Sequence, residues 1–283
     1  MKEILLNILK IGLPLSIVAV MFAQGLKIVP SQLLMFRERP LLMLRSLAVV
    51  LLFVPIAVLA IILLLKPSLP VTVGLAILVA SPAAPLMLVK VPGKGGSLAY
   101  MASLHLSLSL LALVTVPVTL YLLSAALGFQ VEVDVFAVAK VVGMTILLPV
   151  GCGLLIRSFF PKVADAIGPA LSKTGSIVLL LFVLVVVVMT YGVLLRMDPW
   201  SYLVMAIVVI VSLAIGHVLG PGDEKERTTL AMESAARHPG LAMTIATLNF
   251  SPQQALPVLV PYMIVFVAVT TIYLQWRKRS TAE

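Results

Sequence analysis

The chain has 283 residues, of which 61 % are hydrophobic and only 11 % are charged, and its mean hydropathy is +1.19. Soluble domains carry roughly 25 % charged residues, so the composition excludes a water-soluble fold and indicates that a lipid bilayer is the solvent. The formal net charge of +9 does not indicate nucleic-acid binding, because the basic residues gather in short gaps between apolar stretches.

Nine apolar stretches follow one another along the chain, and each has the roughly 20 residues that cross a bilayer. Their ranges are 4–26, 41–65, 71–91, 97–124, 134–157, 174–195, 199–219, 227–249 and 254–276. The first lacks a small-residue cleavage site, which predicts a retained helix. We expect a single all-α polytopic membrane domain with about nine transmembrane helices. No Arg- and Ser-rich transit segment precedes the first stretch, which favours a bacterial inner membrane.

Lysine and arginine are distributed unequally between the two sides that nine crossings define. One side receives 13 of them and the other receives 5. The 13 are Lys27, Arg37, Arg39, Arg45, Lys94, Arg157, Lys162, Lys173, Lys225, Arg227, Arg277, Lys278 and Arg279. Because basic residues are enriched on the cytoplasmic side, we predict an external N-terminus and a cytoplasmic C-terminus.

The third and eighth stretches carry prolines near their middles, at Pro82, Pro85 and Pro239. Proline removes a backbone donor and clashes with the preceding turn. The carbonyls freed in this way are those of Leu78, Ser81 and Ala235. Hydrocarbon cannot satisfy freed carbonyls, so these broken helices are expected inside the protein or along a cavity.

The two broken stretches lie five helices apart, so they cross the membrane in opposite directions. Each precedes a stretch with a similar ending, around Tyr121 in one case and Tyr273 in the other. This pattern predicts an inverted repeat that relates residues of about 4–124 to those of about 174–276. Paired broken helices in inverted halves are typical of a transporter with a binding site near the bilayer midplane.

Ionisable residues concentrate on the broken stretches and on the one that follows the first. They are Lys90, His105, Glu233, Arg237 and His238. Charge inside a membrane is costly and marks a functional site. Structural roles are alternatives: Lys90 reaching the interface, His105 bonded within the bundle, and His238 capping the break. Glu233 and Arg237 are four residues apart, which predicts an ion pair along one helical turn.

These residues carry a resemblance to the bile acid:sodium symporter family, whose members include the apical sodium-dependent bile acid transporter. The matching segments are 21–26 with Pro30-Ser31, Ser81-Pro82 with 94–96, and 233–242. The resemblance implies inverted repeats of ten helices, or of nine where the first is absent, and this chain is similar to the nine-helix form. It also implies two sodium ions behind the crossing of the broken helices.

The chain departs from the family at most positions where the resemblance implies a sodium ligand. Glu233 remains, but the other positions are occupied by Val50, Met87, Leu88, Met101, His105, Arg237 and His238. Thioether, alkyl and guanidinium groups cannot supply the hard oxygen ligands that such a cation requires. We therefore expect weak or no sodium dependence, with Glu233 as the one sodium ligand if sodium binds at all, and a proton as the alternative coupling ion.

The expected function is secondary transport of a small organic anion, with the site where the third and eighth stretches cross. The N-termini of the half-helices aim N–H groups and positive dipole ends at an anion. We expect those donors around Met87-Leu88 and Gly240-Leu241, with added charge from Arg237, His238 or Lys90.

The bilayer is the other expected partner, while no cofactor, nucleic acid or obligate protein partner is indicated. A membrane sensor that binds the anion without transporting it is an alternative. An enzyme is not expected, because a metallo-hydrolase built on Glu233, His105 and His238 would lack a recognisable ligand spacing such as H-E-x-x-H.

Overall fold

A computed structural model describes residues 2–27, 38–82, 96–128, 134–249 and 252–280, and every element assigned in these ranges is a helix. Five of the described helices are long and apolar enough to cross a membrane: Pro40–Leu65, Tyr100–Leu127, Phe136–Phe159, Pro199–Val218 and Val258–Arg279. Shorter apolar helices occupy Leu15–Lys27 and Leu69–Val79. The predicted all-α polytopic membrane fold is confirmed.

The first half of the chain contains α1 (Lys2–Lys27), a bent helix formed by α3 (Pro40–Ala48), the π-helical turn η2 (Val49–Phe53) and α4 (Val54–Leu65), then α5 (Leu69–Val79) and α7 (Leu98–Leu127). The second half contains α8 (Val135–Val142), η4 (Gly143–Leu147), α9 (Leu148–Phe159), α10 (Pro161–Arg196), α11 (Pro199–Val218), α12 (Glu224–Ala235), α13 (Pro239–Asn249) and α14 (Pro252–Ser280). Helical structure is therefore found in each of the nine predicted ranges.

Local signals explain where several helices begin and end. The side chain of Ser97 accepts a hydrogen bond from the N–H of Tyr100 at the start of α7, and Asp198 accepts one from Ser201 at the start of α11. Such N-caps satisfy donors that the first helical turn leaves free. Gly128 ends α7 with φ of 66°, a left-handed conformation that glycine adopts without strain.

One helix extends well beyond its predicted apolar stretch. The sixth stretch begins at residue 174, whereas α10 begins at Pro161. Proline is well tolerated at a first helical position, because its missing N–H has no intrahelical acceptor there. Lys162 and Asp165 make the added turns polar, and Arg157 of α9 pairs with Asp165. Hydropathy finds the membrane-crossing part of a helix and misses such a polar extension.

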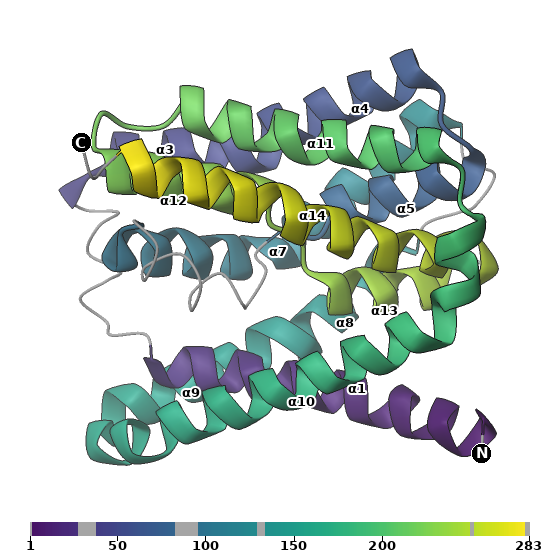
Figure 1. Ribbon diagram of the computed structural model, residues 1–283. Coiled ribbons are helices and arrows are strands. Elements are labelled where there is room, and N and C mark those ends of the chain that lie inside the picture. Colours follow the sequence, from purple (N-terminus) through teal and green to yellow (C-terminus); the bar gives the residue numbers. More distant parts are fainter. Residues whose placement is uncertain (1, 28–37, 83–95, 129–133, 250–251, 281–283) are drawn as a thin grey trace.

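The helices form two groups, visible in Figure 1 as a lower layer of α1, α9 and α10 and an upper group that contains α3, α4, α5, α11, α12 and α14. In the lower layer the backbones of α1 and α9 touch at Gly25 and Gly153. A Cβ atom on Gly153 would lie 2.4 Å from the carbonyl oxygen of Phe22. Small residues allow such close packing of membrane helices, where no hydrophobic effect drives association.

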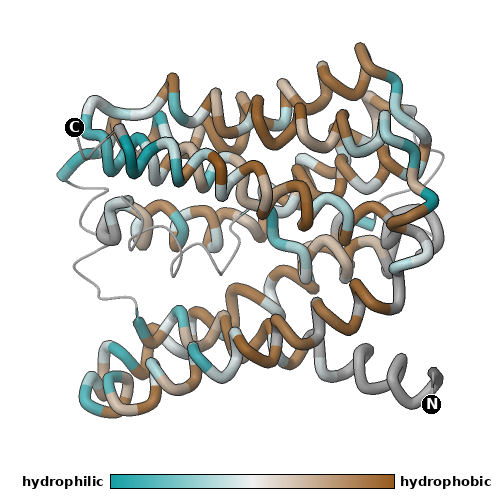
Figure 2. Tube along the Cα trace, in the orientation of Figure 1, coloured by the Kyte–Doolittle hydropathy of each residue, from teal (hydrophilic) through white to brown (hydrophobic). Residues whose placement is uncertain are grey.

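Five charged residues form ion pairs at one end of the helices, which we call the charged helix end (Arg39, Glu224, Glu226, Arg227 and Arg277). Both guanidinium nitrogens of Arg39 donate to the Glu226 carboxylate, and Arg277 pairs with Glu224. Figure 2 shows this end as a hydrophilic region beside long hydrophobic helices. The start of α1 and the end of α14 lie at opposite ends of the molecule (Figure 1), as an odd number of crossings requires.

Candidate functional site

The first helix break follows α5, which ends at Val79. The N–H of Ser81 turns back to the carbonyl of Leu78 at 3.0 Å, and the Ser81 hydroxyl donates to the carbonyl of Ile77 at 2.8 Å. Both Ser81 and the following Pro82 are buried. The Leu78 carbonyl, one of the three expected to be freed by proline, is thus satisfied by a tight turn.

The second break separates α12 from α13. Helix α12 ends at Ala235, and Ala236 has extended backbone with ψ of 130°. Helix α13 begins again at Pro239, where the missing N–H costs nothing. Only residues 236–238 are unwound, and all three are buried in protein. An unwound backbone at this depth is tolerated because lipid does not reach it.

The two breaks meet, as the sequence predicts. The backbone N–H of His238 in the second break donates to the carbonyl of Ser81 in the first at 2.8 Å. The Ser81 carbonyl, another of the three expected to be freed by proline, is therefore satisfied by a residue 157 positions further along the chain (238 − 81). We call this contact and the side chains around it the helix crossing.

Glu233 lies in the last turn of α12 with none of its surface exposed. Its Oε1 lies 3.1 Å from Nδ1 of His105 on α7, which is also buried. Its Oε2 and the Nε2 of His105 have no hydrogen-bond partner among the described residues. A buried carboxylate is therefore held by a single imidazole hydrogen bond among the described residues.

The predicted ion pair between Glu233 and Arg237 is not formed. Because α12 ends at Ala235, the four-residue spacing no longer places the two side chains on one helical face. Arg237 instead donates from Nη2 to the carbonyl of Ser234 at 2.7 Å, while its Nη1 has no partner among the described residues. The guanidinium, only 4 % exposed, lies within electrostatic range of Tyr262 and Glu233.

His238 caps the half-helix α13. Its Nδ1 accepts the backbone N–H of Leu241 at 3.1 Å, and its carbonyl accepts the N–H of Ala242 at 3.0 Å. The Leu241 N–H, one of the donors expected to face an anion, is therefore already occupied. Gly240 is a packing position, since a Cβ there would lie 2.1 Å from the side chain of Ile17. Of the anion donors expected near Gly240, the Leu241 N–H is thus engaged within the protein.

Buried polar atoms without a partner gather around the helix crossing. The atoms of this kind among the described residues of the crossing are His105 Nε2, Glu233 Oε2, Ser234 Oγ, Arg237 Nη1, His238 Nε2 and the Tyr262 hydroxyl. Native proteins satisfy most buried polar atoms, so such a group is characteristic of a place for a ligand, an ion or water. Sequence analysis did not identify Ser234 or Tyr262, although a tyrosine after Pro261 in an apolar helix is a weak signal for a buried hydroxyl.

Four predicted site residues, Met87, Leu88, Lys90 and Pro85, lie outside the described part of the chain. The described surroundings of Glu233 do not fit sodium. Its nearest polar neighbour is an imidazole nitrogen, and the nearby Arg237 guanidinium would repel a cation. Sodium requires several oxygen ligands, which these groups do not provide. No cluster of histidine, cysteine, aspartate or glutamate suited to a metal ion occurs in the described ranges.

Comparison with known proteins gives one family match. The model of the Sodium Bile acid symporter family matches residues 14–197, which extend from the middle of α1 to the end of α10. No individually curated protein gave a match. The matched range includes the first helix break and His105, while the second break lies beyond it.

Proposed function

The chain belongs to the sodium bile acid symporter family, and from this membership we propose that it is a secondary transporter that carries a small organic anion without requiring sodium. The observation that supports this function best is the hydrogen bond from His238 N–H to the Ser81 carbonyl. It joins two broken helices inside the protein, the arrangement in which secondary transporters bind their substrates.

Arg237 supports an anionic substrate. Its guanidinium is buried at the helix crossing, and Nη1 has no protein partner among the described residues. Arginine stays charged at any physiological pH and binds carboxylates through directed hydrogen bonds. The nearby Tyr262 hydroxyl offers a further donor. We propose that these two groups bind the acidic group of the substrate.

His105 and Glu233 favour proton coupling over sodium coupling. The two side chains are in direct contact at 3.1 Å, and each keeps one polar atom unpartnered. A carboxylate inside a membrane must be neutralised by a proton, a metal ion or a fixed cation. Since Arg237 does not pair with Glu233 directly, we propose that a proton shared between Glu233 and His105 replaces the family's sodium.

A flux assay tests the proposal. Purified protein in liposomes is offered radiolabelled taurocholate, pyruvate and pantoate, with a sodium gradient, an inward proton gradient, or neither. We expect uptake of at least one anion to accelerate with the proton gradient and to be unchanged by sodium. Sodium-driven uptake would contradict the proposal, and binding without any flux would identify a membrane sensor instead.

We further propose that the charged helix end faces the cytoplasm of a bacterial inner membrane and that the N-terminus lies outside. The excess of 13 over 5 basic residues on that side supports this orientation. Reporters that are active only in the cytoplasm should work when fused to the C-terminus and fail at the N-terminus. Activity at both ends would require an even number of crossings.

A further inference from the structure

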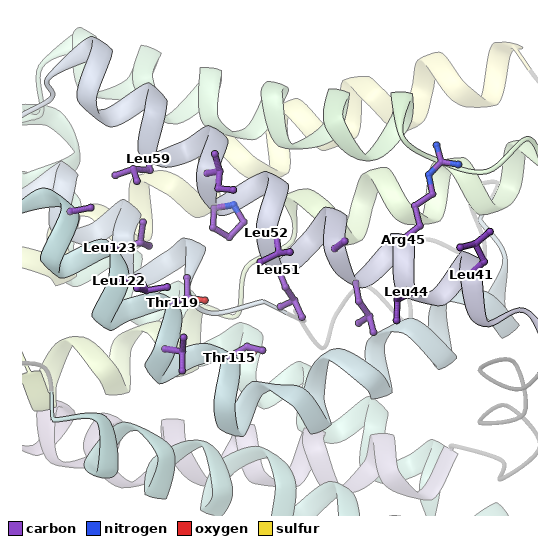
Figure 3. A pocket seen from close by; sticks show the side chains of 16 residues that line it. Leu41, Leu44, Arg45, Leu51, Leu52, Leu59, Thr115, Thr119, Leu122 and Leu123 are labelled. Carbon is purple, nitrogen blue, oxygen red and sulfur yellow. The ribbon is translucent and has the colours of Figure 1, made fainter.

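A long apolar groove lies away from the helix crossing, between the bent helix α3–η2–α4 and α7. Its cavity volume is about 920 Å³. Figure 3 shows leucines such as Leu52 and Leu59 from the bent helix on one wall, and Leu122 and Leu123 from α7 on the other. From Leu41 to Leu59 the groove follows 18 residues of helix, about 27 Å at 1.5 Å per residue. That length approaches the roughly 30 Å thickness of a bilayer core.

The walls of the groove are strongly exposed. Leu44 is 67 % exposed, Leu52 58 % and Ile56 63 %. Both helices are long and apolar enough to cross the membrane, so this surface faces lipid. Hydrocarbon chains are therefore expected to occupy the groove. The shape favours an extended acyl chain lying between the two helices.

One charge marks an end of the groove. Arg45 is the single charged residue among the described residues that line it, and it lies five residues after Pro40, about 8 Å from the start of α3. Arg39 and Arg277 at the same end are paired with Glu226 and Glu224. The Arg45 guanidinium, in contrast, makes no hydrogen bond or ion pair within the described ranges, and the residue is exposed. An exposed arginine beside an apolar groove is suited to a phosphate group.

A second polar group lies deeper in the groove. Thr115 lines it, and the buried Oγ1 of Thr115 has no partner in the described structure. Hydroxyls elsewhere in these helices donate to the carbonyl four residues earlier, as Ser46 on α3 and Ser109 on α7 do. The Thr115 oxygen is itself buried, so the lipid site depends on Arg45 and the apolar walls and not on Thr115.

We propose that this groove binds one anionic phospholipid, with the phosphate at Arg45 and an acyl chain along the leucines of α3–η2–α4 and α7. The cation selects the anionic headgroup, and the apolar walls bind the chain. Since a phospholipid spans one leaflet, it fills the half of the groove that begins at Arg45. The site is separate from the helix crossing, so it does not depend on the coupling ion or on the transported anion.

Native mass spectrometry of the full-length protein in detergent tests the proposal. The protein is titrated with phosphatidylglycerol and, separately, with phosphatidylcholine of the same acyl chains. We expect wild type to bind phosphatidylglycerol more tightly. Arg45→Gln should reduce this preference by about fivefold, which corresponds to about 1 kcal/mol. Arg279→Gln, which removes an exposed charge at the same end but outside the groove, should leave the preference unchanged.

Leu52→Trp fills the groove from an exposed position and should weaken binding of both lipids. A melting temperature near that of wild type establishes that each variant is folded. Equal lipid preference of the Arg45→Gln and Arg279→Gln variants would overturn the assignment, as would unchanged lipid binding by Leu52→Trp. A dimer that Leu52→Trp dissociates, in place of bound lipid, would show that a second copy of the chain occupies the groove.

Discussion

The acids at the charged helix end and the acid at the helix crossing have opposite surroundings. Glu226 accepts two bonds from Arg39, and Glu224 is contacted by Arg227 and Arg277. Glu233 contacts one imidazole and is fully buried. At the charged helix end, acids pair with arginines that never lose their charge, and such pairs stabilise the fold modestly where solvent reaches them. At the helix crossing the acid contacts an imidazole, and several buried polar atoms have no partner among the described residues, as the proposed binding of a proton and an organic anion requires.

The largest expected effect is the loss of driven uptake in Glu233→Gln. Glutamine keeps the shape of the side chain but removes the carboxylate that we propose accepts the proton. Proton-driven uptake in liposomes should fall more than tenfold, which corresponds to at least about 1.4 kcal/mol. Glu226→Gln is the matched control at the charged helix end, and it should retain most of its uptake. Similar uptake by both variants would remove the distinction between the two regions.

Double-mutant cycles should separate the two neighbours of Glu233. Combining His105→Ala with Glu233→Gln is expected to give a coupling of about 1–3 kcal/mol in unfolding free energy, because the residues are in contact. Combining Arg237→Gln with Glu233→Gln should give a smaller coupling, because no hydrogen bond connects the two side chains and only their longer-range attraction remains. Denaturation of the detergent-solubilised variants measures both cycles. If the coupling of Arg237 with Glu233 were the larger of the two, it would support the ion pair predicted from the sequence.

The pair of Arg39 and Glu226 should contribute less than the contact between Glu233 and His105. The Arg39 side chain is 46 % exposed, so solvent reaches one partner although the Glu226 side chain is only 11 % exposed, and ion pairs that solvent reaches contribute about 0.2–1 kcal/mol, screened by salt. Glu226→Gln should therefore lower the unfolding free energy only within that range, and the difference from wild type should shrink at high ionic strength. A loss that does not respond to salt would mean that the burial of Glu226 outweighs the exposure of Arg39.

The smallest effect is expected from Glu224 on acidification. Its hydrogen bond with Arg277 holds the pKa of the Glu224 carboxyl below its ordinary value of 4.5. A lowered pKa in the folded state means that the stabilisation is present above pH 4.5 and is lost as the pH falls through the folded-state value. Arg277→Gln should abolish this part of the acid sensitivity, and at neutral pH it also removes the stabilisation by the pair and by the hydrogen bond that Arg277 donates to the Thr228 hydroxyl. Melting temperatures of wild type and Arg277→Gln between pH 3 and pH 7 measure this acid sensitivity. Identical pH profiles would exclude the Glu224–Arg277 pair as its source.

Several features of the helix crossing follow from the sequence alone. Hydropathy marks the helices because lipid imposes a minimum apolar length, and Pro82 and Pro239 mark the breaks because proline lacks an N–H. Both signals are local, so they can be interpreted without a three-dimensional structure. The predicted ion pair between Glu233 and Arg237 is absent for a local reason as well. A four-residue spacing brings two side chains together only on a continuous helix, and α12 ends at Ala235.

The sequence by itself determined that the chain lies in a membrane, where its helices break and which residues carry charge at those breaks. Only the tertiary structure decided which charges are partners. His105 and Glu233 are separated by 128 residues, and the Ser81 carbonyl accepts its hydrogen bond from His238 on a different helix pair. Helix periodicity relates residues within a few turns, whereas contacts between helices depend on how whole surfaces pack, which no short pattern specifies.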